Sequence, residues 1–275
     1  MTLETLLQNP NALPAAPKVV DELIGSFDNV GVALEEIGRK LSLDPVLSAK
    51  LLRLANCAYY HVSRRIGNVE DAVRMLGFVT VRTLVISSGL VGGFKTVPGL
   101  DLKRFWRYSL HTAVAGKWIA RRVGVNTDLA FTIGMMHAIG QLVMHTGMPA
   151  ESVELDKTVG AYDVERLGAE RAAFGFDFAT VGAELATRWK FPDIFAGTIR
   201  ALSAAPEDVL ASRMAGVIVL AAWRARADEL KLTADEIAAS LPLAIAQGLG
   251  LTADELLKDM PSLPELSAGL EDLIL

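Results

Sequence analysis

Apolar residues recur at spacings of three and four along most of the chain, whereas stretches with the strict alternation of a β-strand are short. This pattern predicts one helix after another. Several helices have clear predicted boundaries: Asp44 and Asp101 can cap free backbone N–H groups, and Pro45 suits a first helical turn. Gly77 and Gly124 follow apolar stripes and predict helix ends. The fold class is therefore predicted to be all-α, a multi-helix bundle.

Two near-identical segments close to the C-terminus also predict helix starts. They read LTADEI at residues 232–237 and LTADEL at residues 251–256. In each, the threonine hydroxyl can accept from the backbone N–H three residues later, and the glutamate can reach back to the threonine N–H. We therefore expect two capped helices in this region.

Residues 129–150 contain no Asp, Glu, Lys or Arg, and this length alone would suit a membrane-spanning helix. His137, Gln141 and His145 within it are costly in hydrocarbon, and the glycines of the segment weaken a spanning helix further. We therefore expect one buried core helix here and no membrane insertion.

Composition restricts the function and the compartment. The formal net charge is -5 and the pI is about 5.5, which argues against general nucleic-acid binding. Cys57 is the single cysteine, so no intramolecular disulfide can form, and residues 1–16 lack the order of a signal peptide. These features favour a reducing, cytoplasmic location.

The run LDPVLSAKLLRLANCAYY, residues 43–60, resembles the signature of the HDOD family, the HD-related output domains of bacterial signalling. Residues 66–77, 105–110, 134–143 and 182–192 resemble the segments that follow it in the family. We interpret these signature residues as structural: Asp44, Pro45, Leu51, Leu54, Asn56, Tyr59, Gly77 and Trp106.

The resemblance extends over residues 13–205 and implies a helical, HD-like fold with a role downstream of a stimulus. It divides the chain into a tail (1–12), an N-terminal helical part (13–100), an HD-like core (101–205) and a C-terminal helical extension (206–275). Because so little chain precedes the module, we expect its input to come from another molecule or a ligand.

Catalytic HD enzymes hold a divalent metal with a histidine from one helix, an adjacent His-Asp pair from another, and a later aspartate. The resemblance places Tyr108 at the first histidine, and the pair reads His137-Ala138. Gln141 replaces a lysine that often follows, and Phe178 stands where a polar residue is common. A neutral phenol and an alanine cannot supply the anionic cage that such metals need. We predict no catalytic residue, metal or cofactor, and a vestigial pocket made of Tyr108, His111, His137, Ala138 and Gln141.

Histidines could still form a substitute site. If residues 129–150 are one helix, spacings of four bring His137, Gln141 and His145 to overlapping faces. His111 could then meet them across the bundle and complete a zinc site. The alternative, which we favour, is that these are buried imidazoles bonded to their neighbours.

The predicted function is therefore a non-catalytic signalling adaptor that binds a partner protein or a small effector. Tyr59, Tyr60 and His61, with Arg64 and Arg65, are candidate partner-binding residues in a loop, or core aromatics at a helix end.

Two other functions remain open. The first is a divergent metal-dependent phosphohydrolase or cyclic-dinucleotide phosphodiesterase with rearranged ligands. The second is a nucleotide or anion sensor, because arginine forks suit phosphate oxygens. The arginines that could build its binding face, or simply cover apolar helix faces in solvent, are Arg64, Arg65, Arg74, Arg82, Arg104, Arg107, Arg121 and Arg122.

Overall fold

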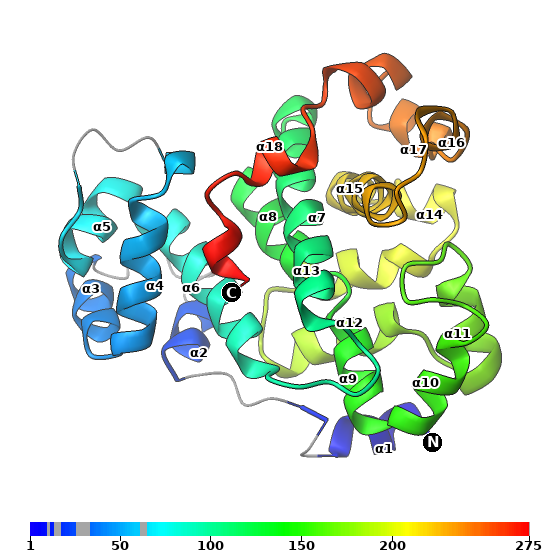
Figure 1. Ribbon diagram of the computed structural model, residues 1–275, viewed down its shortest axis with the longest axis horizontal. Helices are drawn as coiled ribbons and strands as arrows, with labels where there is room; N and C mark the ends of the chain where they lie inside the picture. Colours follow the sequence, from blue (N-terminus) through cyan, green and yellow to red (C-terminus); the bar gives the residue numbers. More distant parts are fainter. Residues whose placement is uncertain (10–11, 14–17, 26–33, 61–64, 275) are drawn as a thin grey trace.

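The computed structural model describes residues 1–9, 12–13, 18–25, 34–60 and 65–274. Within these residues it contains eighteen α-helices, a few short 3-10 or π turns, and no strand (Figure 1). The all-α prediction is confirmed. Among the described residues, no single helix is long and apolar enough to cross a membrane; only two consecutive helices, bent by 118°, would pass that test together.

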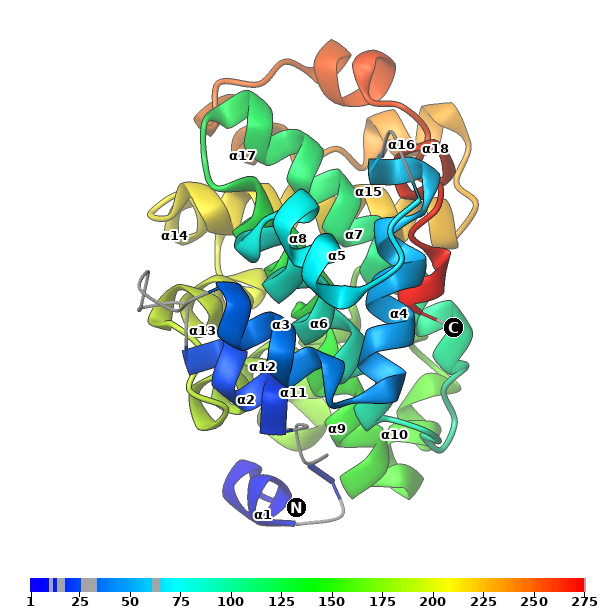
Figure 2. The same cartoon turned by 90° about the vertical axis from the view of Figure 1, so that its left-hand side faces the viewer.

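An N-terminal lobe occupies one side of the molecule (Figures 1 and 2). Its helices are α2 (Lys18–Gly25), α3 (Leu34–Ser42), α4 (Pro45–Ala55), α5 (Val69–Leu76) and α6 (Phe78–Gly93).

The signature residues shape this lobe. The Asp44 carboxylate caps α4 by accepting from the backbone N–H groups of Val46 and Leu47, at 3.0 Å each. The Asn56 side chain donates to the carbonyl of Ile66 at 2.9 Å and accepts from its N–H at 2.7 Å. Asn56 thereby ties the end of α4 to the segment before α5.

The other signature residues pack or end helices. Leu51, Leu54 and Trp106 are buried, and Tyr59 is half-buried beneath the Lys117 ammonium. Gly77 ends α5 at a φ of 77°, a backbone conformation that glycine adopts without strain.

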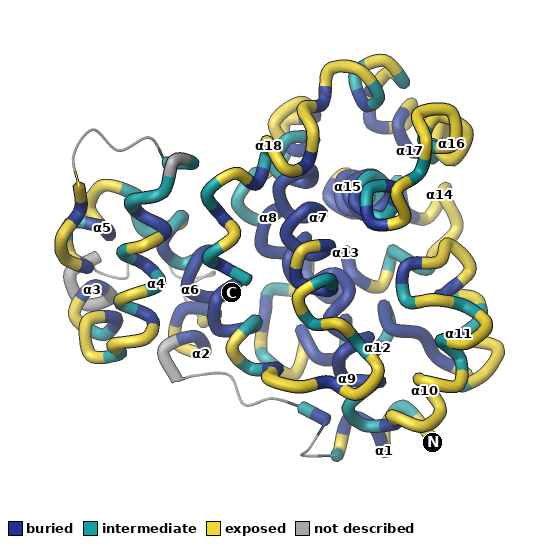
Figure 3. The backbone as a smooth tube through the Cα atoms, in the orientation of Figure 1, coloured by how far each residue is buried: buried dark blue, intermediate teal, exposed yellow. Residues whose placement is uncertain are grey.

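The core is built around α7, which runs from Leu102 to Val123 and is buried along most of its length (Figure 3). Asp101 caps its start, and Gly124 ends it in the left-handed conformation, as predicted. The helices that pack on α7 or complete the core are α8 (Thr127–Met136), α9 (Ile139–Gly147), α12 (Phe178–Arg188), α13 (Asp193–Arg200) and α15 (Arg213–Glu229).

The prediction of one continuous helix over residues 129–150 was wrong, although the segment is a buried part of the core as expected. The helical segment is broken between α8 and α9, where His137 is the C-terminal cap residue of α8 and Ala138 is the N-terminal cap residue of α9. The His137 imidazole donates to the carbonyl of Gly134 at 2.7 Å. In a continuous helix that carbonyl would accept the backbone N–H of Ala138.

The segment predicted as an N-terminal tail contains a helix. This is α1 (Leu3–Gln8), whose Leu6 side chain is fully buried against the core. The Arg188 guanidinium donates to the carbonyl of Leu7 at 2.7 Å and fixes α1 beside α9 and α12.

Shorter helices complete the chain: α10 (Pro149–Asp156), α11 (Arg166–Phe174), α14 (Pro206–Val209), α16 (Ala234–Ala239), α17 (Leu243–Gly248) and α18 (Leu263–Ser267). Both predicted capping boxes form, with reciprocal bonds between Thr233 and Glu236 and between Thr252 and Glu255. The second box leads into a π-helical turn rather than an α-helix.

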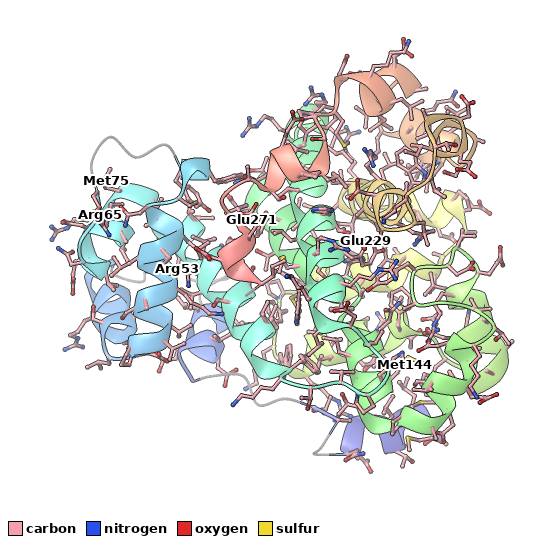
Figure 4. The ribbon with its side chains drawn as sticks, viewed as in Figure 1. Arg53, Arg65, Met75, Met144, Glu229 and Glu271 are labelled. Carbon is pink, nitrogen blue, oxygen red and sulfur yellow. The ribbon has the colours of Figure 1, made fainter. Side chains whose placement is uncertain are left out.

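The C-terminal turn, Glu271–Leu273, returns to the N-terminal lobe. It packs against α4 and α6 with Leu273 fully buried, and Asp272 forms an ion pair with Arg53. Arg53 and Glu271, labelled in Figure 4, mark the two sides of this contact. The end of the chain therefore joins the lobe to the core.

The crossing of α9 and α12 generates a stability prediction. A Cβ atom on Gly140 would lie 2.0 Å from the carbonyl oxygen of Phe178 and 2.8 Å from the backbone nitrogen of Gly182. Gly140→Ala must therefore force the two helices apart, and we expect a loss of about 3 kcal/mol or more of unfolding free energy. Urea unfolding followed by circular dichroism measures it. Gly168→Ala, in a helical position with nothing within 4 Å, is the matched control and should be neutral or slightly stabilising. Equal effects of the two substitutions would contradict the close crossing.

Candidate functional site

The rings of Tyr108 and His137 meet inside the core. Tyr108 comes from the first half of α7 and His137 from the break after α8, and their ring centroids are 4.9 Å apart at 63°. The Tyr162 ring also contacts the Tyr108 ring, with a centroid separation of 5.1 Å. All three residues are buried.

His137 is held as a neutral hydrogen-bond acceptor. Its Nδ1 donates to the Gly134 carbonyl, so the remaining nitrogen, Nε2, carries a lone pair. Nε2 is buried and has no hydrogen-bond partner among the described residues. Burial lowers the pKa of His137 to about 4, and the nearby Arg226 guanidinium acts in the same direction.

The Arg226 guanidinium, from α15, lies beside the Tyr108 side chain. Burial raises the pKa of Tyr108, and the arginine only partly opposes that rise. The phenol is therefore neutral at physiological pH. Arg226 was not among the residues predicted from the sequence; the signal available was its position, with Arg224, directly after the apolar run of residues 214–223.

The side chains of Tyr108, His137 and Arg226 line a cavity of about 380 Å³ between the core and the C-terminal extension. Most of its remaining lining is apolar, including Leu167, Phe178, Val219, Ala222, Trp223, Leu232 and Pro242. Val164 and Leu230 stand at its mouth, with 69% and 43% of their surfaces exposed. The indole N–H of Trp223 donates to the Ser240 hydroxyl at 3.1 Å and ties the end of α16 to α15.

A buried arginine positions the rim of the cavity. The Arg166 guanidinium donates to the carbonyl of Val159 at 2.8 Å and to the Glu170 carboxylate at 2.7 Å, and it also binds Asp156. Glu170 in turn accepts from the backbone N–H of Phe178 at 2.7 Å. Burial raises the pKa of Glu170 to about 7 against the opposing effect of Arg166. This network joins the rim to the start of α12.

Two of the five residues predicted for the pocket, Tyr108 and His137, line this cavity. Ala138 is fully buried at the start of α9, and the Gln141 amide donates to the Ala161 carbonyl at 2.9 Å. His111 faces Asp228 on α15, with 3.2 Å between Nδ1 and the carboxylate, and lowers the pKa of Asp228.

The histidines do not form the alternative zinc site, because His137 and His145 do not share a helix. His145 Nδ1 donates to the Pro98 carbonyl at 3.0 Å, and Nε2 lies 3.6 Å from Asp156. In the described part of the chain, no three His, Cys, Asp or Glu side chains are grouped so that they could hold a metal ion.

The side chains that the family resemblance predicts at an HD metal position do not fit a divalent cation. Tyr108 is a neutral phenol, His137 offers one neutral nitrogen, and Ala138 offers no donor. The Arg226 guanidinium would repel a cation placed beside them.

Among the candidate arginines that the structure describes, the four on α7 are divided between different contacts. Arg104 and Arg107 both bind the Glu229 carboxylate, at 3.1 Å and 2.7 Å, and this hydrogen bond raises the pKa of Arg107. Glu229 lies between α7 and α15 (Figure 4) with 1% of its side chain exposed. Arg121 follows Arg107 by almost four helical turns, roughly 20 Å. Arg122 instead lies over the Trp118 ring at 3.2 Å.

The aromatic candidates for partner binding lie at the end of α4. Tyr59 and Tyr60 are both half-buried and contact each other edge to face, and burial raises the pKa of Tyr60. They are therefore not a freely exposed loop. His61 and Arg64 lie outside the described residues.

Comparison with known proteins identifies the HDOD domain, whose family model matches residues 13–205. An uncharacterized protein of Treponema pallidum (strain Nichols) is 25% identical over 192 residues, which are 68% of this chain and 37% of that protein. The chain thus spans little more than a third of that relative's length.

Solved structures resemble nearly the whole chain. A protein of Shewanella amazonensis SB2B named "Putative phosphohydrolase" is 33% identical with a TM-score of 0.78, covering 98% of this chain and 96% of its own. An HDOD domain protein with unknown function from Geobacter sulfurreducens has a TM-score of 0.74 at 22% identity, and the match covers 98% of this chain and 95% of that protein's chain. A protein of Marinobacter aquaeolei VT8 named "Putative signal transduction protein" has a TM-score of 0.71 at 22% identity, and the match covers 98% of this chain and 59% of that protein's chain.

The Glu229 ion pairs generate a second stability prediction. Glu229→Gln keeps the shape but removes the charge that two arginines share, and we expect a loss of about 2 kcal/mol of unfolding free energy. Glu184→Gln is the matched control, because the ion pair of Glu184 with Arg200 is exposed and should contribute less than about 0.5 kcal/mol. Urea unfolding of both variants measures the difference. A loss no greater than that of the control would contradict a structural role for Glu229.

The buried imidazole generates a pH prediction. The folded pKa of His137 is about 4 against an ordinary value of 6.5, so the unfolded chain binds more protons between these values. The contribution of the neutral His137 to the unfolding free energy is therefore complete above about pH 6.5. Roughly 3 kcal/mol of it is lost as the pH falls to 4. His137→Asn keeps the donor to Gly134 and cannot titrate, so its unfolding free energy should fall less than that of the wild type between pH 7 and 5. Identical slopes in the two proteins would refute the burial of a neutral imidazole.

Proposed function

Because the chain belongs to the HDOD family, we propose that it is a non-catalytic signalling module that acts by binding a partner protein or a small effector. One observation carries the proposal: the cleft that corresponds to an HD metal site holds the Tyr108 phenol, the His137 imidazole and the Arg226 cation in place of a ligand set. A hydrolytic metal needs anionic ligands and an open position for water. A guanidinium in the cleft opposes both.

The names of the similar proteins point in two directions, toward phosphohydrolase activity and toward signal transduction. The chemistry of the side chains favours the second for this chain. Neutral phenol, neutral imidazole and guanidinium together stabilise an uncharged or anionic guest and not a cation.

The remaining features support a regulatory protein in the cytoplasm. The net charge of -5 disfavours general nucleic-acid binding, and Cys57 is half-buried with its pKa raised by burial, which does not suit a reactive thiol. We propose that the input or output of the module is a signalling protein.

Metal loading tests the proposal. The full chain is incubated with Mn²⁺, Fe²⁺, Zn²⁺ or Mg²⁺, desalted and submitted to elemental analysis, and it should retain well below one ion per chain. Hydrolysis of p-nitrophenyl phosphate and bis(p-nitrophenyl) phosphate should not exceed that of the His137→Ala variant, because no ligand set holds a water-activating ion.

Stoichiometric metal together with turnover that His137→Ala abolishes would establish a divergent phosphohydrolase instead. His111→Ala is the matched control, since His111 does not line the cavity. Loss of turnover in both variants would show that His137 has no special part in it.

A further inference from the structure

We propose that the cavity between α7 and α15 binds a small organic monoanion, an apolar body with one carboxylate and one N–H or O–H donor, and that Arg226 is its charge partner. This inference rests on the proposed function, since it names the effector class of the same cleft.

The first observation is the uncompensated charge of Arg226. Its neighbour in the cavity wall, Tyr108, is a neutral phenol. The acidic residues nearest in sequence are already engaged, Glu229 with Arg104 and Arg107, and Asp228 with His111. Among the described residues no carboxylate forms an ion pair with Arg226. A half-buried guanidinium without a carboxylate at the wall of a cavity favours an anionic guest.

The second observation is the unfilled acceptor on His137. Nε2 lacks a hydrogen-bond partner among the described residues, in a side chain that is 1% exposed and lines the same cavity. Leaving a buried acceptor without a donor costs about 1–3 kcal/mol. A guest with an N–H or O–H group satisfies it, while the Tyr108 hydroxyl remains able to donate to the carboxylate.

The size and lining of the cavity define the rest of the guest. Its volume of about 380 Å³ lies within the range of small-molecule sites, and aromatic walls are provided by Phe178 and Trp223. These surfaces gain free energy by covering an apolar body.

The charge of the guest follows from the balance of charges around it. One guanidinium neutralises one negative charge. Asp163 also lines the cavity, at its exposed rim, where its carboxylate accepts the backbone N–H of Glu165 at 2.9 Å. A phosphate dianion would retain an uncompensated charge beside Asp163, so a monocarboxylate is favoured.

Binding is tested with 4-hydroxyphenylacetate and indole-3-acetate, which combine a carboxylate, an aromatic body and one donor. The full chain is titrated in EDTA, and the indole N–H signal of Trp223, assigned with Trp223→Phe, is followed by ¹H–¹⁵N NMR. Both acids should shift this signal saturably. Phenylacetate, which lacks the donor, and indole-3-acetamide, which lacks the charge, should bind more weakly.

Variants locate the site. Arg226→Gln should weaken binding of both acids at least tenfold, whereas Arg224→Gln, on the same helix but outside the cavity lining, should leave it unchanged. Ala222→Leu fills the cavity without changing its charge and should also abolish binding, which keeps the test valid if Arg226→Gln fails to fold.

Three outcomes would overturn the inference: no saturable shift with either acid, equal loss in the Arg226 and Arg224 variants, or tighter Arg226-dependent binding of phenyl phosphate than of the carboxylates. The EDTA makes these outcomes independent of metal-dependent hydrolysis. A chain that binds neither acid and hydrolyses nothing loses this inference but keeps the proposed signalling role.

Discussion

The structure of the site depends on the packing of α15 against α7. Glu229 at the end of α15 is almost completely buried and binds the guanidinium groups of Arg104 and Arg107, one helical turn apart on α7. Two charge-assisted contacts from one carboxylate restrict both the register and the rotation of α15. Because Arg226 precedes Glu229 by about one turn, the same restraint places its guanidinium beside Tyr108.

The C-terminal extension is therefore part of the pocket and of the fold. Residues beyond the family match form one wall of the cavity through α15 and the segment that follows it. The last turn reaches back to α4 and α6, where Asp272 pairs with Arg53. The packing of α15 and α18 on α7, and of the last turn on α4 and α6, removes apolar surface from water and stabilises the extension against both the core and the lobe.

The cleft has the opposite electrostatic character to an HD metal site. An enzyme of that class gathers carboxylates and imidazoles, which attract a cation and lower the pKa of its bound water. Here burial keeps Tyr108 protonated and His137 unprotonated, and the charge nearest to them is positive. The scaffold retains a partly open, mostly apolar cavity, and in the proposed function its polar groups recognise the guest.

The sequence alone determined what depends on neighbouring residues along the chain. Helical periodicity, the caps at Asp44 and Asp101, and the stop at Gly124 are local, so the all-α class could be predicted. The family resemblance also brought Tyr108 and His137 to attention. Only the tertiary structure decided the break between α8 and α9, the docking of α1 and the position of Arg226. Each of these depends on which faces of distant helices meet, and a rotation of one residue, about 100° on a helix, would turn Arg226 away from the cavity.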